Sequence, residues 1–303
     1  MNSHFRKAIE SATTNEKYKF IKAHASGHSV EKMCKLLKVS RSGYYDWLDR
    51  PAPKRENKQK EILDIIIKTH KKHEMWGVDP IWAEVNETIR CSRGTVYRLM
   101  KKNNIKSKRK AKWKATTNSN HKLPVAPNLL EQNFDVELPN IVWVGDITYH
   151  WTDEGWLYTA VVKDLCTKDI VGYAMGDRMT KELVIKAMEM AIKKERPKPG
   201  LIFHSDRGSQ YCSNDYKELL KSNNIRQSMS RKGNPYDNAC AENFFSCLKC
   251  ECTNFYHFRN RNEAKQTIFE YIEVYYNRQR RHSALGWLTP AVYKKMIFKS
   301  IAA

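Results

Sequence analysis

Residues 141–151, IVWVGDITYHW, decide the fold of this 303-residue chain. Their β-branched and aromatic side chains predict a strand. Two more strands are expected at 156–165 (WLYTAVVKDL), after the turn at 152–155, and at 168–175 (KDIVGYAM). The connections between these segments are short, so we expect three consecutive antiparallel strands.

Helical and strand patterns alternate after these three strands. The expected elements are a helix at 180–195, a buried strand at 201–205 (LIFHS), a helix at 213–222, a short strand at 226–229, and helices at 237–251 and 262–278. Three hairpin strands followed by alternating helices and strands are typical of a ribonuclease-H-like α/β domain. We assign this domain, with its C-terminal helices, to residues 139–295.

The first third of the chain predicts small helical modules instead. Residues 1–55 contain helical patterns joined by a tight break, and Ser40 is placed to cap the helix that follows it. Residues 56–105 repeat this order, with Asp79 expected as one helix cap and Ser92 as the next. Helix, tight turn and helix favour two helix-turn-helix modules that bind DNA. The alternative is a pair of helical hairpins that pack on another part of the protein.

Charge supports a nucleic-acid partner. The chain carries 54 Lys and Arg against 33 Asp and Glu, a net charge of +21, and residues 1–125 hold 29 of those basic residues but only 12 of the acidic ones. Such a local surplus favours a polyanion, although a solubilising surface or a ribosome-associated tail would also show it. Residues 106–138 read as a basic linker or a simple tether. The candidate contacts to the grooves or phosphates are Arg41, Ser42, Arg93 and Thr95.

The sequence contains no apolar stretch long enough to span a membrane and no secretory signal. We therefore expect a cytoplasmic protein whose eight cysteines are reduced thiols. Cys247 and Cys250, with Cys240 and Cys252 nearby, invite a zinc interpretation. We disfavour it, because only one close pair exists and it falls in a predicted helix rather than a zinc-binding turn.

Three carboxylates fall where catalysis on phosphodiesters could use them. Asp146 lies in the middle of the first strand, Asp206 just past the end of a buried strand, and Glu242 early in a helix. Taken singly, each could also be a turn residue, a cap or a solvated side chain. Mg²⁺ prefers carboxylate oxygens and substrate phosphate oxygens, and two such ions stabilise both oxygens of an in-line displacement. The competitors that we weigh are Asp153, Asp164 and Asp237.

Four blocks in order carry a family resemblance. They are WVGDITY (143–149), HSDRGSQY (204–211), SRKGNPYDNACAENFFSCLK (230–249) and YYNRQRRHSALGWLTP (275–290). They resemble integrase-type transposases of bacterial insertion sequences, and in particular the second-frame product of the insertion-sequence-three family. This family shares a ribonuclease-H-like core with retroviral integrases. VSRSGYYDWL (39–48) and SRGTVYRLM (92–100) are also typical of it.

The resemblance implies a catalytic triad of the DDE type on Asp146, Asp206 and Glu242. These residues would hold two Mg²⁺ or Mn²⁺ ions and carry out DNA strand cleavage and strand transfer. The family's basic residue seven positions after the glutamate falls on Lys249, which shares a helical face with Glu242 and could bind DNA or be an ordinary surface lysine.

Other residues receive secondary roles. Arg280 and His282 are candidate DNA contacts. Asn238 and His204 are expected to support the carboxylates from behind, although His204 could equally be a satisfied core histidine. The chain departs from the family at 77–81, where Gly-Val-Asp-Pro-Ile replaces the usual Gly-Tyr-Arg-Arg-Ile, and this weakens a phosphate contact by that helix.

The resemblance implies a bacterial, nucleoid-associated protein whose partners are the DNA of the transposon ends and the target. The chain is expected to form a homo-oligomer on DNA, because two ends must be held together, and to work with the first-frame product, because it lacks an evident heptad zipper. Two rival functions stay open, a catalytically inactive DNA-binding regulator of transposition and a structure-specific nuclease.

Overall fold

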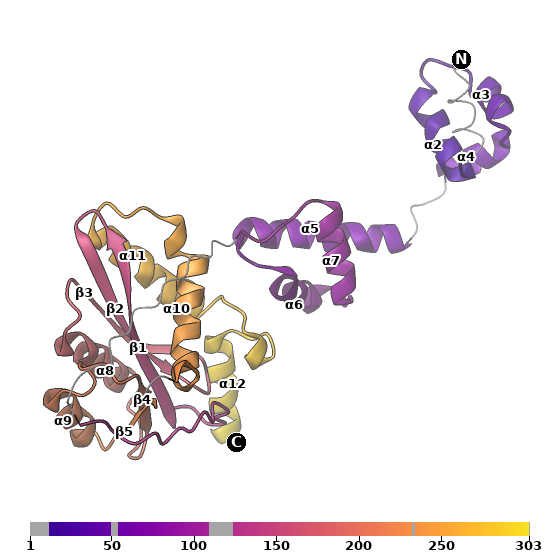
Figure 1. Ribbon diagram of the computed structural model, residues 1–303. Coiled ribbons are helices and arrows are strands. Elements are labelled where there is room, and N and C mark those ends of the chain that lie inside the picture. Colours follow the sequence, from indigo (N-terminus) through magenta and orange to yellow (C-terminus); the bar gives the residue numbers. More distant parts are fainter. Residues whose placement is uncertain (1–11, 50–53, 109–123, 232–233, 303) are drawn as a thin grey trace. The chain divides into compact units, whose positions relative to one another are not determined.

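The computed structural model describes residues 12–49, 54–108, 124–231 and 234–302. Backbone packing divides the chain into two compact units, residues 1–64 and 65–303. The division falls inside a long helix, α5 (Lys54–Lys72). Figure 1 shows the elements of each unit. The domain boundaries proposed from the sequence at residues 55, 105 and 138 stay predictions.

The described part of the first unit contains three short helices before α5. They are α2 (Thr14–His24), α3 (Val30–Leu37) and α4 (Arg41–Asp49). Their shared core consists of Tyr18, Ile21, Met33, Cys34, Leu37 and Tyr44. The chain leaves α3 through Lys38, whose φ of 53° is left-handed. Ser40 Oγ then accepts a hydrogen bond from Gly43 N at 3.2 Å, so the predicted turn and its capping serine are confirmed.

Two helices follow α5 in the second unit, α6 (Val78–Thr88) and α7 (Arg93–Lys102). Ser92 Oγ accepts a hydrogen bond from Thr95 N at 3.3 Å, as predicted for the cap of α7. The prediction for Asp79 was wrong, because Gly77 is the N-cap of α6 and Asp79 lies in its first turn. There the Asp79 carboxylate forms an ion pair with Arg93, and this long-range partner could not be read from the local pattern.

The described residues form one sheet of five strands. They are β1 (Val142–Thr152), β2 (Gly155–Asp164), β3 (Ile170–Gly176), β4 (Ile202–Ser205) and β5 (Arg226–Met229). Their order in space is β3-β2-β1-β4-β5. Strands β1, β2 and β3 are antiparallel, whereas β4 is parallel to β1 and β5 to β4. This is the predicted ribonuclease-H-like sheet, with β1 at its centre.

Helices cover both faces of the sheet. Helices α8 (Lys181–Glu195) and α9 (Asn214–Ser222) pack on one face, and α10 (Ala239–Glu251) and α11 (Arg261–Glu270) on the other (Figure 1). Trp143 and Phe203 are fully buried beneath the first pair. Gly172 lets α8 approach β3 closely, since a Cβ there would lie 2.2 Å from the Ala187 carbonyl oxygen.

The C-terminal region differs from its prediction in three ways. The helix expected at 237–251 starts with a 3-10 turn, η1 (Pro235–Asn238), and the one expected at 262–278 changes from α11 to a π-helix, η3 (Tyr271–Tyr276). After η3, Asn277 exchanges two hydrogen bonds with the backbone of Ile170, at 2.9 and 3.1 Å. That pairing with β3 is tertiary, so the 3.6-residue periodicity could not indicate it.

The third difference is a terminal helix that the sequence did not predict. The remaining elements are η2 (Thr253–Phe255), η4 (Ser283–Leu285) and α12 (Pro290–Ala302). Lys294 of α12 bonds to Asp169 at 3.2 Å and to Glu195 at 2.6 Å. These ion pairs tie α12 to the core. Across the residues described, no helix has the length and apolar character needed to cross a bilayer.

Candidate active site

Asp146 and Asp206 emerge side by side from neighbouring parallel strands. The last paired residues of β1 and β4 are Gly145 and Ser205, so each aspartate is the next residue along its strand. Strands in a sheet lie ~4.8 Å apart, which brings these two backbone positions close together. The sequence predicted Asp146 in the middle of one strand and Asp206 just past the end of another. Only the order of the strands in the sheet makes the two residues neighbours.

Backbone amides orient the two aspartates. Asp146 Oδ1 accepts a hydrogen bond from Ile147 N at 2.7 Å, and Asp206 Oδ1 accepts one from Gly208 N at 2.9 Å. A side chain at position 208 would crowd this contact, since a Cβ there would lie 3.0 Å from Asp206 Oδ1. The glycine in the HSDRGSQY block therefore lets the chain fold back onto the carboxylate.

Glu242 joins the two aspartates from the helix that packs on β1. It lies in the first turn of α10 and is exposed. Burial and the charges of Asp206 and Glu242 raise the pKa of Asp146 well above its usual value. Burial and Asp206 likewise raise the pKa of Glu242. The three carboxylates therefore lie within electrostatic reach of one another.

The chemistry of the three side chains suits a divalent cation, although they are not arranged as a ready-made set of ligands. All three groups offer carboxylate oxygens, which hard cations such as Mg²⁺ prefer, and their mutual repulsion is the kind that a bound cation relieves. Lys249 is the cation that offsets part of the charge at Asp146. Within the described ranges, no three His, Cys, Asp or Glu side chains are gathered closely enough to form a metal-binding group.

Lys249 lies on the side of α10 that faces β1. Its Nζ is 5.2 Å from the ring centroid of Tyr149, a cation–π distance. Burial lowers the pKa of Lys249, while the nearby Asp146 raises it. The lysine thus lies between the carboxylates and an aromatic surface, and it is half-buried rather than an ordinary solvated surface lysine.

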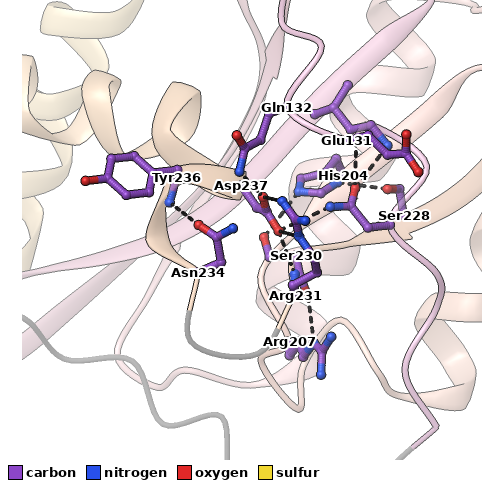
Figure 2. Close-up of polar contacts among 12 residues, drawn as sticks. Glu131, Gln132, His204, Arg207, Ser228, Ser230, Arg231, Asn234, Tyr236 and Asp237 are labelled. Carbon is purple, nitrogen blue, oxygen red and sulfur yellow. Dashed lines mark hydrogen bonds and ion pairs between the residues drawn. The ribbon is translucent and has the colours of Figure 1, made fainter.

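His204 is a fully buried residue of β4, two positions before Asp206. Its Nδ1 and Nε2 lie 2.8 Å from Ser228 Oγ and 3.2 Å from Ser230 Oγ. Figure 2 shows the three side chains. Burial lowers the pKa of His204 to about 4, so the ring is neutral at pH 7. It fastens the end of β4 to β5, which suits either interpretation drawn from the sequence.

Asp237 anchors the loop that leads into α10. Its buried carboxylate accepts hydrogen bonds from Arg231 Nε at 3.1 Å, Arg231 Nη2 at 3.0 Å and Arg231 N at 2.8 Å. Gln132 Nε2 adds a fourth at 2.7 Å (Figure 2), and Asn128 Nδ2 a fifth at 3.1 Å. These contacts hold the pKa of Asp237 well below its usual range, with Arg231 as the main cause. Asp237 therefore shapes the loop and is no substitute for the three carboxylates.

Asn238 differs from its prediction, and Lys163 was not predicted at all. Asn238 is the N-cap of α10, yet its side chain makes no capping hydrogen bond, and its buried Oδ1 has no partner in the part of the chain that the structure describes. Lys163 was not singled out, although its buried Nζ donates to the Cys240 carbonyl at 3.1 Å. A lone lysine in the apolar strand WLYTAVVKDL was the available signal.

The competing aspartates have other partners. Asp164 Oδ1 accepts hydrogen bonds from the amide and hydroxyl of Thr167, at 2.7 and 2.9 Å, and Oδ2 accepts one from Asn140 N at 2.7 Å. It closes the turn after β2. Asp153 lies 3.0 Å from His257 Nε2 at the other end of the hairpin. Neither belongs to the carboxylate group around Asp146.

Arg280 and His282 lie inside the protein rather than on an open DNA-binding surface. The Arg280 guanidinium forms two 2.9 Å hydrogen bonds to Glu251, and their side chains are only 16% and 2% exposed. Arg280 Nη2 also lies 3.2 Å from Cys247 Sγ. Burial and neighbouring cations lower the pKa of His282 to about 2. These contacts give the pair a role in holding η3 and α10 together, and the DNA contact expected of Arg280 and His282 stays a prediction.

The other candidate DNA contacts lie at helix starts. Arg41 is exposed and 3.5 Å from Glu31, and Ser42 Oγ is 2.9 Å from Ser40 Oγ. In the second module, Thr95 Oγ1 is 3.0 Å from Ser92 Oγ, and Arg93 is paired with Asp79. Asp79, which departs from the family motif, therefore forms an ion pair with Arg93, one of the predicted DNA contacts.

Comparison with known proteins gives the family. Integrase core domains match residues 137–235 and 223–290, and an HTH-like domain matches residues 56–113. The chain is 49% identical over 265 residues to the insertion element IS600 uncharacterized 31 kDa protein of Shigella sonnei, covering 87% of this chain and 97% of that protein. It is 40% identical over 282 residues to transposase InsF for insertion sequence IS3A of Escherichia coli (strain K12), covering 92% and 98%.

Solved structures with some likeness are retroviral integrase cores. One is the HTLV-2 integrase catalytic core domain in complex with magnesium, at 18% identity and a TM-score of 0.41, covering 52% of this chain and 97% of that one. Another is the catalytic core domain of BIV integrase, at 18% identity and a TM-score of 0.41, covering 54% and 99%. Domain matches and curated relatives together show that the chain belongs to the insertion-sequence-three (IS3) family of bacterial transposases.

Proposed function

We propose that Asp146, Asp206 and Glu242 are the catalytic triad of a DNA strand-cleavage and strand-transfer reaction. The register of β1 and β4 carries this proposal, because it sets the two aspartates next to each other. The proposal is also supported by the raised pKa values of Asp146 and Glu242, to which the charge of Asp206 contributes in both cases. Each residue also matches the triad position of the family motif.

We assign Mg²⁺ or Mn²⁺ to this site, as two ions held by the three carboxylates. When bound, such ions would neutralise phosphate charge and activate the attacking oxygen. The chain's own contribution is orientation. The amides of Ile147 and Gly208 each fix one oxygen of the neighbouring aspartate, Asp146 Oδ1 and Asp206 Oδ1.

The reaction has two displacements at phosphorus. In the first, a water oxygen bonds to phosphorus at the element's end, the bond to the 3′ oxygen breaks, and that oxygen takes a proton to become a 3′-hydroxyl. In the second, this 3′-hydroxyl loses its proton and its oxygen bonds to phosphorus in another strand, and the 3′ oxygen displaced there takes up a proton. One phosphodiester is exchanged for another in the second step, so no external energy source is required. Lys249 is placed to bind a substrate phosphate.

DNA binding is assigned to both helix-turn-helix modules, which lie in the strongly basic first two-fifths of the chain. Arg41, Ser42, Arg93 and Thr95 are the proposed contacts. We also propose that the chain acts on DNA as a homo-oligomer, because two element ends must be joined, and that the first-frame product of the same element assists it.

A strand-transfer assay with labelled terminal DNA and Mg²⁺ tests the proposal. Asp146→Asn, Asp206→Asn and Glu242→Gln should each reduce cleavage and joining by at least about a thousandfold while DNA binding persists. Asp177→Asn and Glu218→Gln change exposed carboxylates elsewhere and should have little effect. Binding without cleavage by the unaltered chain would favour the regulator, and cleavage without joining would favour the nuclease.

A further inference from the structure

A pocket of about 210 Å³ opens beside Lys249, away from the carboxylates. The end of β1 contributes Tyr149 and His150, and the segment after α10 contributes Tyr256 and Phe258. Position 150 is four residues along β1 from Asp146, ~13 Å at the usual rise of a strand. Lys249 is two turns along α10 from Glu242, ~10 Å at the rise of a helix. The pocket therefore lies within a few nucleotides of the proposed reaction centre.

His150 lines this pocket, and its buried ring carries an unsatisfied nitrogen. Its side chain is only 6% exposed, and no described residue forms a hydrogen bond with its Nε2. Burial and the charge of Lys249 lower the pKa of His150 to about 3, so the ring is neutral at pH 7. An unsatisfied buried polar atom is costly. An uncharged ligand with a hydrogen-bonding edge would satisfy it, and each DNA base has such an edge.

The rim of the pocket is aromatic. Tyr256 is 55% exposed and stacks on Phe258, with ring centroids 5.6 Å apart and planes 12° from parallel. Trp151 is equally exposed and contacts Trp156 edge to face at 4.8 Å. Unpaired bases stack on aromatic side chains regardless of sequence. Lys249 beside Tyr149 supplies the positive charge that a neighbouring phosphate requires.

We propose that this pocket receives one unpaired base of the DNA strand that is cut at Asp146, Asp206 and Glu242. The inference rests on the proposed function, whose substrate strand it specifies. The base stacks against Tyr256, its edge bonds to His150, and its phosphate lies near Lys249. The enzyme thereby requires the end of its DNA substrate to be locally unpaired.

Binding of 2-aminopurine DNA to the full chain, without divalent cation, tests this inference. Forked duplexes would carry the fluorescent base at each of the first four unpaired positions, since ~13 Å spans about four base steps of 3.4 Å. We expect strong quenching at one position and about fivefold tighter binding of forked than of blunt DNA. Equal affinity for forked and blunt DNA, or no position-dependent quenching, would overturn the inference.

Three variants separate the pocket from general folding and from catalysis. Tyr256→Ala removes the exposed stacking ring, and His150→Phe keeps the ring volume but removes the nitrogens. Both should abolish the quenching and the preference for forked DNA while blunt-duplex affinity is retained. Phe269→Ala removes a similarly exposed ring on α11 and should behave like the unaltered chain. Unchanged quenching in Tyr256→Ala, whose altered side chain is exposed, would count against the pocket even if His150→Phe unfolds.

Failure of the inference and failure of the proposed function give different results. Base quenching without any strand cleavage in Mg²⁺ would contradict the proposed catalysis but support base binding in the pocket. Tyr256→Ala and His150→Phe could instead cleave and join blunt and forked DNA at normal rates. That result would contradict base binding in the pocket but support the proposed catalysis.

Discussion

Arg231 and Asp237 form a two-point ion pair across the loop before α10, with Nη2–Oδ1 and Nε–Oδ2 distances of 3.0 and 3.1 Å. The Asp237 side chain is fully buried, whereas that of Arg231 is 58% exposed. The pair closes the loop whose next element carries Glu242. We infer that it positions Glu242 against the two strand aspartates.

Asp237→Asn should therefore slow cleavage without weakening DNA binding. The asparagine side chain is uncharged and has a single acceptor oxygen, so it cannot replace the carboxylate in both guanidinium hydrogen bonds. We expect a loss of about 2 kcal/mol in the free energy of unfolding and about a tenfold lower single-turnover cleavage rate. Denaturant unfolding and single-turnover kinetics measure these effects. Asp215→Asn removes an exposed ion pair to Lys181 and should cost under about 0.5 kcal/mol.

The stability difference caused by Asp237→Asn should depend on pH in one direction. Arg231 holds the pKa of Asp237 well below its usual range, so the ion pair stabilises the fold above the usual Asp pKa of ~3.9. The difference in unfolding free energy between the two proteins should be full at pH 7 and shrink as the pH falls below that value. A difference that stays constant from pH 7 to pH 2 would show that charge pairing is not its cause.

Mild acid should destabilise the core through His204. Its pKa is about 4 in the folded chain, because of burial, against ~6.5 in an unfolded chain. Below pH 6.5 the unfolded chain takes up a proton that the folded ring refuses, so stability falls between pH 6.5 and 4, by about 3 kcal/mol. His204→Gln should make that fall shallower in denaturant titrations. An NMR titration that puts the His204 midpoint near 6.5 would contradict this.

Arg280→Ala should damage the fold rather than DNA binding alone. It leaves the Glu251 carboxylate, 2% exposed, without its cation, and breaking such a buried pair costs about 3 kcal/mol. Thermal unfolding measures this loss, and Arg278→Ala is the control, since Arg278 is exposed on the same segment. Reduced DNA affinity at unchanged stability would restore the DNA contact expected from the sequence.

Gly172→Ala should strongly destabilise the second unit. The new Cβ would lie 2.2 Å from the Ala187 carbonyl oxygen and 2.8 Å from the Ala191 side chain, so α8 must move off β3. We expect a loss of about 3 kcal/mol, measured by denaturant unfolding. Gly27→Ala, where nothing lies within 4 Å of the new Cβ, should change stability by less than about 1 kcal/mol. Equal effects at the two glycines would exclude the close approach as the reason.

The sequence indicated most of the elements because their periodicities are local. The alternation in residues 141–151 and the serines at positions 40 and 92 gave strand β1 and two helix starts, since a strand face and a capping oxygen act within a few residues. Asp79 was misassigned because its partner, Arg93, is 14 residues away. The π-helix and α12 were missed because their partners are distant in the chain. Asn277 bonds to Ile170 of β3, and Lys294 bonds to Asp169 and to Glu195 of α8. No local period records such contacts.

By itself, the sequence determined most of the elements, the basic N-terminal region and the three candidate carboxylates, because residue type, spacing and motif are properties of the chain alone. The tertiary structure decided which groups meet. Strand order made Asp146 and Asp206 neighbours, and packing turned Arg280 inward to Glu251. It also left His150 Nε2 without a described partner beside Lys249. Contacts between distant segments depend on how sheet and helices close over one another, and that closure fixes distances the linear pattern does not contain.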